Sequence, residues 1–210
     1  MTASGCIPIA TDWTQVAYAI TTVLILIAAI WGKQIRYRFA HPDFCIELNN
    51  PAGICVDRRN GTFVWFFHLR VVNKNPRTRA RVRVCCTRIE RCDSLGRWIA
   101  EQFPDRLPFL WAYSDVYGYR ERVVGDRASI DCASVDRNSD ELILALGICP
   151  NNVNYAIRKG ERIRVYLDLE IRSVLHGKDS VFEVAWNGEW SSDANQMFSN
   201  VQITKFDQAA

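Results

Sequence analysis

A single uncharged apolar stretch near the amino terminus constrains this chain more than any other feature. Residues 13–32 read WTQVAYAITTVLILIAAIWG and contain no Asp, Glu, Lys or Arg. At about 1.5 Å of rise per residue, roughly twenty helical residues span about 30 Å, which matches the hydrocarbon core of a bilayer. A helix also satisfies its own backbone hydrogen bonds, as the bilayer interior requires. The stretch therefore predicts a transmembrane helix over residues 13–32, preceded by a short tail of residues 1–12.

Four side chains mark the predicted anchor. Trp13 and Trp31 bracket the stretch, where an indole with an apolar ring and a polar N–H suits the membrane boundary, and Leu24 and Leu26 lie in its middle. A buried core helix and a cleaved signal peptide are the alternatives. The first would show a polar stripe, and the second a basic leading segment and small residues for cleavage. The stretch lacks these features, which favours an uncleaved anchor.

The residues that follow the stretch indicate its direction. Lys33, Arg36 and Arg38 lie in a basic connector, residues 33–42, which is expected to continue as helix and to end before Pro42. The tail has no basic side chain, so the positive-inside rule places the amino terminus outside and the remainder in the cytoplasm. The predicted location is the cell (inner) membrane, crossed once.

Residues 43–210 change to a period of two, which is typical of strands. The clearest case is 162–172, where Ile163, Val165 and Leu167 alternate with charged or aromatic residues. Asn60-Gly61 predicts a tight hairpin, and Asn60-Gly61-Thr62 can also be read as a glycosylation sequon. A helical turn or two is expected over residues 98–103, and an exposed loop over 114–125. Roughly seven to nine short strands predict a mostly β fold, an antiparallel immunoglobulin-like β-sandwich after one transmembrane helix.

Seven of the eight cysteines follow the anchor. An odd number cannot pair completely within one chain, and several occupy apolar strand positions, where free cysteine behaves as a small buried hydrophobe. A zinc site is the alternative, but no CxxC pair is present, and adjacent Cys85 and Cys86 would point to opposite faces of a strand. No metal or cofactor is therefore predicted.

Two segments carry a resemblance to known domains. Leu69 to Ile89, LRVVNKNPRTRARVRVCCTRI, resembles the strand-Asn-turn-strand unit of bacterial adhesion-type immunoglobulin-like domains. RIRVYLDLEIRS with FEVAWNGEW resembles the closing hairpin of uncharacterised bacterial membrane-anchored domains that end in a Trp-x-Gly-x-Trp-like signature, here Trp186 to Trp190. The resemblance implies fold and anchoring, and it transfers no catalytic residues.

Catalytic motifs are not evident in the sequence. The three histidines, His41, His68 and His176, fall in the connector, on a mixed strand face and in a turn. No nucleophile elbow, phosphate loop or zinc-protease helix motif occurs. The favoured function is a non-enzymatic module that binds another protein or organises a membrane complex. A pocket that joins His68 to two carboxylates would favour an enzyme instead.

The most specific surface feature is a row of four arginines of one strand parity: Arg77, Arg79, Arg81 and Arg83. Such side chains repeat at about 6.5 to 7 Å on one face of a strand, which suits phosphates or lipid headgroups. The alternative is that the row pairs with acidic side chains of a neighbouring strand, such as Asp168 and Glu170. If the row binds a ligand, anionic lipid is a better candidate than nucleic acid, because the anchor holds the domain beside a negatively charged leaflet.

Aromatic residues in the irregular middle of the chain give a second candidate surface. Trp111, Tyr113, Tyr117 and Tyr119 are predicted to form an interaction loop, since Tyr and Trp are common interface anchors. Packing within the domain is the alternative for the same residues.

Overall fold

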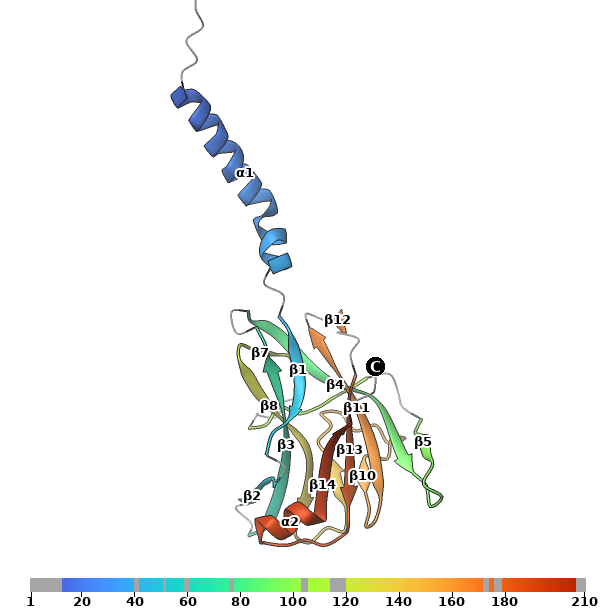
Figure 1. Ribbon diagram of the computed structural model, residues 1–210. Helices are drawn as coiled ribbons and strands as arrows, with labels where there is room; N and C mark the ends of the chain where they lie inside the picture. Colours follow the sequence, from blue (N-terminus) through green and yellow to red (C-terminus); the bar gives the residue numbers. More distant parts are fainter. Residues whose placement is uncertain are drawn as a thin grey trace, which may run out of the picture. The chain divides into compact units, whose positions relative to one another are not determined.

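The computed structural model describes residues 13–39, 42–50, 52–58, 61–75, 78–102, 106–113, 120–171, 174–175 and 179–206. The chain divides into two compact units, residues 1–41 and 42–210 (Figure 1). Several predicted features lie outside the described residues: the tail 1–12, Asn60, Arg77, Tyr117 and Tyr119.

The first unit contains one helix, α1, which spans Trp13–Phe39. The predicted span and most of the connector therefore form one continuous helix, and it ends before Pro42 as expected. The side chains of Trp31, Lys33, Arg36 and Arg38 are outside the described part of this helix. Its segment Trp13–Ile30 is long and apolar enough to cross a membrane.

Two threonines interrupt the apolar surface of α1, and the helix itself satisfies both. The Thr21 hydroxyl donates to the carbonyl of Ala17 and the Thr22 hydroxyl to that of Tyr18, each at 2.8 Å. A hydroxyl that donates its hydrogen bond to a carbonyl one turn earlier does not need water as a partner for this donor. These two polar groups are therefore compatible with a hydrocarbon environment.

The second unit is mostly β, and its described strands form two antiparallel sheets. Sheet A contains β1 Phe44–Leu48, β2 Ile54–Asp57, β3 Phe63–Asn73, β8 Arg127–Asp136, β9 Leu142–Leu144 and β10 Ala156–Ile157. Sheet B contains β4 Ala80–Cys92, β5 Trp98–Ala100, β6 Leu107–Pro108, β7 Arg122–Val124, β11 Arg162–Ile171, β12 Val174–Leu175, β13 Ser180–Trp186 and β14 Val201–Phe206. A short helix, α2 Ala194–Asn200, precedes β14.

The two sheets share one hydrophobic core. It contains the odd-numbered residues of β3, such as Phe67 and Leu69, and those of β11, such as Val165 and Leu167. Trp186 at the end of β13 is the largest fully buried side chain. The predicted alternation along β11 is confirmed, because its apolar side chains of one parity face this core, and β3 and β4 also turn alternate apolar side chains toward it.

The segment after β6 passes from one sheet to the other. The backbone N–H of Phe109 donates to Val84 of sheet B at 2.9 Å, whereas that of Leu110 donates to Ala145, which follows β9, at 3.0 Å. Phe109 and Trp111 then bridge to Leu146 and Ile130. Residues 108–111 are therefore a crossing segment that ties the two sheets together.

Two local predictions are wrong. Residues 98–100 form strand β5 instead of a helical turn, and residues 122–124 of the expected loop form strand β7. The reason for β5 is turn chemistry: the Asp93 carboxylate accepts from the N–H groups of Leu95 and Arg97, at 2.9 and 2.8 Å, and closes a hairpin on β4. β7 is held by pairing with Ala80 to Val82 of β4, a contact that its own sequence does not reveal.

The predicted hairpin before β3 is confirmed. β2 and β3 pair antiparallel, the N–H of Arg58 donates to the Thr62 carbonyl at 2.9 Å, and Gly61 adopts φ +75°. Glycine is suited to this left-handed conformation because it has no Cβ.

One end of the β domain, the connector end, is defined by the starts of β1, β4 and β8 and the end of β3. Asn73 joins these elements. Its N–H donates to the Asp126 carbonyl at 2.7 Å, and its side-chain amide donates to the carbonyls of Gly125 at 2.7 Å and Thr78 at 2.8 Å. Asn73 is 2% exposed, so these bonds fix the β3–β4 and β7–β8 turns against each other.

Edge strand β1 is capped by a side chain from the other sheet. The Lys205 ammonium of β14 donates to the backbone carbonyl of Ile46 at 3.0 Å. Both strands lie at the margins of their sheets, so the lysine links the two sheets at this margin.

Candidate functional site

The described arginines of the row lie in different environments. Arg81 and Arg83 project from β4 away from the core, as their parity predicts, and Arg79 precedes the strand. The Arg83 guanidinium lies 3.5 Å from the Glu170 carboxylate of β11, which is 13% exposed. Arg79 and Arg81 are exposed, and neither forms an ion pair with a described residue. Glu170 therefore compensates the charge of Arg83, whereas no described residue forms an ion pair with Arg79 or Arg81.

Asp168, the other proposed partner of the row, is buried. It is 2% exposed, and its carboxylate accepts from the N–H of Leu169 at 2.7 Å. Its strand neighbour on β4 is Cys85, also buried, and burial followed by the nearby Glu170 carboxylate raises the pKa of the Cys85 thiol to about 12. Of the two acidic side chains suggested as partners of the arginine row, Glu170 therefore contacts Arg83, whereas Asp168 is buried and does not lie on the surface.

Further along β4, a register shift turns a second set of charges to the outer face of sheet B. The Arg88 guanidinium lies 3.8 Å above the ring of Tyr166, whose hydroxyl donates to Glu90 at 2.7 Å. Burial, reinforced by this hydrogen bond, raises the pKa of the Tyr166 hydroxyl. The contacts cover the ring, which explains why an outward-facing tyrosine is 6% exposed.

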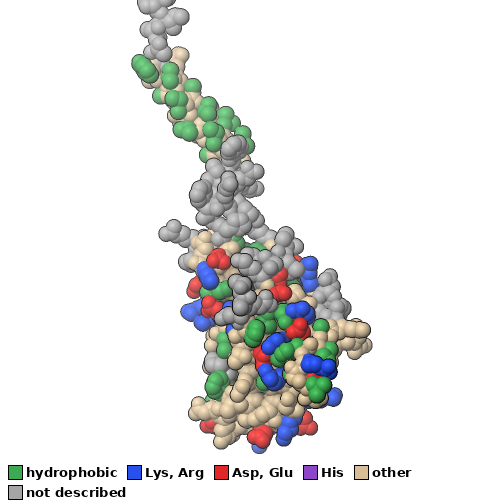
Figure 2. All heavy atoms as spheres, turned by 45° about the vertical axis from the view of Figure 1, so that its right-hand side comes forward, with side chains coloured by type: hydrophobic (Ala, Val, Ile, Leu, Met, Phe, Trp, Pro, Cys, Tyr) green, Lys and Arg blue, Asp and Glu red, His purple; other side chains and the backbone are tan. Residues whose placement is uncertain are grey.

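Next to it, Arg164 of β11 lies between two aromatic rings. Its guanidinium is 3.9 Å from the Trp98 ring and 4.6 Å from the Phe206 ring, and it also contacts Glu183 at 3.4 Å. Arg162 pairs with the same carboxylate. Figure 2 shows basic, acidic and apolar side chains intermingled on the face of the β domain turned toward the viewer. The outer face of sheet B is thus a compensated charge network and is not uniformly basic.

The described aromatic residues of the predicted interaction loop also differ in their exposure. Trp111 is 3% exposed, and its indole N–H donates to the Arg120 carbonyl at 2.8 Å, so it belongs to the core and cannot anchor a partner. The prediction that Trp111 contacts a partner is therefore wrong. Tyr113 is 79% exposed with φ +58°, and Tyr117 and Tyr119 are outside the described residues.

His68 lies under Tyr113 on sheet A, with the ring centroids 5.6 Å apart. It is 4% exposed, and its Nδ1 is 2.8 Å from the Asp131 carboxylate without the alignment of a hydrogen bond. This is one carboxylate, and a catalytic reading of His68 would require a pocket with two. Among the described residues, no group of three or more His, Cys, Asp and Glu side chains could hold a metal ion.

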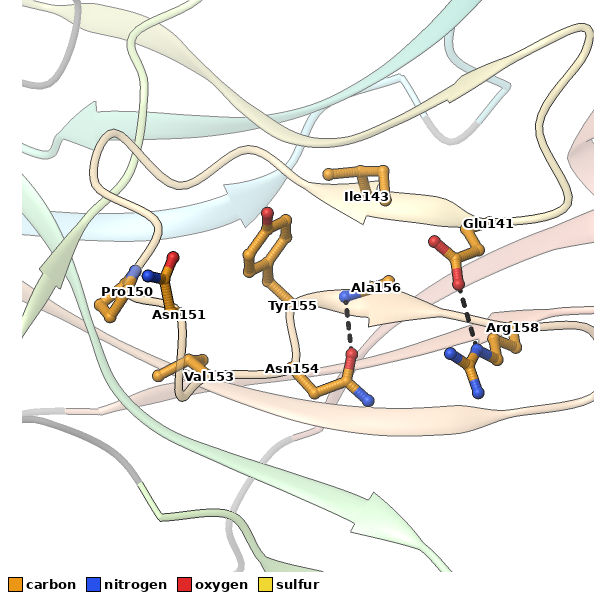
Figure 3. Close-up of a pocket in the computed structure, with 9 residues that line it drawn as sticks. All are labelled: Glu141, Ile143, Pro150, Asn151, Val153, Asn154, Tyr155, Ala156 and Arg158. Carbon is orange, nitrogen blue, oxygen red and sulfur yellow. Dashed lines mark hydrogen bonds and ion pairs between the residues drawn. The ribbon is translucent and has the colours of Figure 1, made fainter.

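A hollow of about 380 Å³ is lined by residues of β9, of β10 and of the segments next to these strands (Figure 3). Its charged groups are already engaged with each other, because Arg158 pairs with Glu141 at 3.1 Å. The neutral Asn154 side chain accepts from the N–H of Ala156 at 3.3 Å. No histidine or cysteine lines it. The hollow therefore offers hydrogen-bonding surface but no evident nucleophile, and sequence reasoning did not find it, since its residues form an ordinary Asn-rich turn.

The Trp-x-Gly-x-Trp signature has a structural role. Trp186 is in the core, and its indole N–H donates to the Asp140 carbonyl at 3.2 Å. Gly188 has φ +87°, and a Cβ at this position would lie 2.4 Å from Lys159 Cγ. Any larger residue at 188 would force the Lys159 side chain to move.

The hairpin of β4 and β5 presents exposed apolar side chains that sequence reasoning missed. Leu95 in its turn is 74% exposed and Ile99 on β5 is 53% exposed. Beside Ile99 lies a mainly apolar hollow of about 210 Å³, bordered by the Arg91–Glu101 ion pair at 2.7 Å. β5 ends the strand order of sheet B, so its outer edge has no strand partner among the described residues. An apolar edge of this kind is typical of a contact surface.

Comparison of the chain with protein-family models, with curated proteins and with solved structures finds no significant match.

Proposed function

We propose that this protein is a single-pass protein of the cell (inner) membrane whose cytoplasmic β domain binds another protein without catalysing a reaction. The observation that carries the proposal is α1, a helix long and apolar enough to cross a membrane. Its intrahelical threonine bonds support the same environment. The basic residues after the apolar stretch support the direction.

For the fold, we propose an immunoglobulin-like β-sandwich of the adhesion type. The antiparallel pairing of both sheets and their common core support this class. The crossing segment and the Lys205 link at the sheet margin fit two sheets that lie face to face.

The hairpin of β4 and β5 is the surface that supports protein binding best. A partner polypeptide in extended conformation can hydrogen-bond to the free edge of β5, while Leu95 and Ile99 supply apolar contact. The ion pair of Arg83 with Glu170 and the network around Arg164 weaken the case for the whole strand face as a nucleic-acid or lipid site.

Partner binding predicts a site-specific crosslink in living cells. A photoreactive side chain at Ile99 should give a discrete adduct, and the same probe at Asn138, exposed on the β8–β9 turn, should not. Leu95→Asp should reduce the Ile99 adduct by roughly tenfold, because a desolvated carboxylate costs at least ~1.4 kcal/mol. Equal adducts at both positions, or none at Ile99, would count against the hairpin as the binding surface.

The proposed orientation predicts that the cysteine of the tail and the exposed cysteines of the β domain lie on opposite sides of the membrane. Cys6 lies in the tail, whereas Cys55 and Cys149 are exposed on the β domain. An impermeant maleimide, applied at pH 8 to intact cells after an impermeant reductant, should label wild type but not Cys6→Ala. Labelling should rise after permeabilisation, and the rise should be smaller in Cys55→Ala/Cys149→Ala. Burial raises the pKa of both domain thiols, so the labelling time is extended. The reverse pattern would place the β domain outside.

A further inference from the structure

The two arginines of the row that form no ion pair with a described residue, Arg79 and Arg81, lie where β4 begins, at the connector end of the β domain. Strand register places Arg81 beside Val123 of β7, and Asn73 ties the turn before β4 to the turn before β8. Two segments far apart in sequence, residues 73–75 with 78–82 and residues 120–127, therefore meet at the connector end, where β7, β12 and the start of β1 appear in Figure 1.

This end carries an excess of positive charge. The described residues of 42–44, 73–82 and 120–127 include six basic side chains against three acidic ones, a net +3. At the far end, the described residues of 57–62, 93–97, 136–141, 158–162 and 186–193 include six basic side chains against eight acidic ones, a net −2. The described segments counted at the two ends therefore differ by five formal charges, +3 against −2.

The exposed cations at the connector end are available to a ligand. Arg79, Arg81 and Lys74 are exposed and form no ion pair with a described residue. Arg122 is exposed, with its guanidinium 6.0 Å from the Trp111 ring, and Arg127 has a loose contact with Asp126 at 3.8 Å. Val123, 59% exposed, is the cross-strand partner of Arg81 and adds an apolar side chain beside that cation.

The covalent connection keeps this end near the bilayer. Residues 40–43 alone separate α1 from β1, which begins at the connector end. Even fully extended, the chain from Phe39 to Phe44 reaches no more than about 18 Å, and the part of α1 that follows the apolar stretch adds about 10 Å. If α1 spans the membrane, a leaflet is therefore the nearest large anionic surface.

We infer that the connector end of the β domain binds the headgroups of anionic phospholipids in the leaflet from which α1 emerges. The inference rests on the proposed membrane anchor and adds a ligand for the domain itself. Each Lys or Arg near an anionic leaflet contributes ~1 kcal/mol, and the attraction decays within about 10 Å, so a short connector is required for it to act. An exposed valine beside an arginine suits the headgroup boundary, which has both charge and apolar depth.

The test uses the full chain in nanodiscs of phosphatidylcholine alone or with phosphatidylglycerol. In a Cys6→Ala/Cys55→Ala/Cys149→Ala background, a nitroxide is attached after Val123→Cys or, as a far-end reference, Leu95→Cys. Collision of the nitroxide with a water-soluble nickel complex should fall at least ~3-fold at position 123 in anionic discs and remain unchanged at 95. High salt should abolish the difference.

Matched charge variants identify the residues. Arg79→Gln/Arg81→Gln/Arg122→Gln should remove the effect of anionic lipid, whereas Arg58→Gln/Arg137→Gln/Arg158→Gln, equal in charge change but at the far end, should retain it. Equal accessibility at position 123 in both kinds of disc overturns the inference. So does binding of a labelled single-stranded oligonucleotide that is lost in the first triple variant without a lipid effect. Cysteine labelling in cells tests the anchor's direction separately, because both faces of a nanodisc are open.

Discussion

Arginine at both Leu24 and Leu26 is expected to release the protein from the membrane. These positions lie in the middle of α1, where an arginine costs about 2.5 to 3.5 kcal/mol and a leucine contributes about 0.5 kcal/mol on the insertion scale. The double substitution therefore costs roughly 6 to 8 kcal/mol, more than enough to prevent insertion. The measurement is the fraction of protein that stays with membranes after an alkaline wash, which should fall from nearly all to a small minority.

Two arginines at the end of α1 provide the control. Trp13→Arg/Thr14→Arg adds the same charge where long side chains reach the interface, so most of the protein should remain in the membrane. If Leu24→Arg/Leu26→Arg also stays in the membrane, α1 is not the anchor and a different part of the chain must hold it there.

The β domain is expected to lose stability steeply above pH 9, because three cysteines are buried as neutral thiols. Burial, then the neighbouring Asp131 carboxylate, raises the pKa of Cys132 to about 12, and the pKa of Cys85 is likewise about 12. Burial also raises the pKa of Cys86, the most of the three. A pKa that is higher in the folded state than in the unfolded state stabilises the fold below pH 9, and this contribution is lost between pH 9 and pH 12.

The expected loss at pH 10 is between about 1 and 2 kcal/mol for each thiol, or about 4 kcal/mol for the three. For a domain of this size, that lowers the melting temperature by roughly 8 to 16 °C. Thermal melts of the detergent-solubilised protein at pH 7, 8, 9 and 10 would measure it.

A matched set of cysteines separates this effect from other alkaline titrations. Cys85→Ala/Cys86→Ala/Cys132→Ala should melt lower at pH 7, since it loses core contacts, but its melting temperature should depend less on pH. Cys45→Ala/Cys55→Ala/Cys149→Ala removes three thiols that are half-buried or exposed, and should keep most of the wild-type slope. Parallel pH profiles for the two variants would contradict the assignment.

The features that sequence predicted best have strong local causes. α1 follows from an uninterrupted apolar composition, and the core parity of β4 and β11 follows from alternation that no competing pattern obscures. The Asn60-Gly61 hairpin is similar, because Gly61 provides a conformation that other residues rarely adopt.

The failures have tertiary causes. Strand β5 was obscured because a local helical reading competes with a turn that depends on Asp93. Trp111 and Asp168 were assigned to surfaces, but partners from distant segments bury them. The parity of the arginine row could be read from sequence. Its continuation into residues 120–127 could not, because strand register and the Asn73 bonds create that neighbourhood.

The lysine cap on β1 has a consequence for copies of this protein that share a membrane. If α1 anchors the protein, tethering restricts diffusion to two dimensions, so neighbouring copies meet often and in a narrow range of orientations. An uncovered strand edge would then promote lateral polymerisation by backbone pairing. With the Lys205 ammonium bonded to the Ile46 carbonyl, such pairing must first break a charge-assisted hydrogen bond and place a cation against the incoming strand. The β1 margin is thereby protected from self-association under crowded conditions.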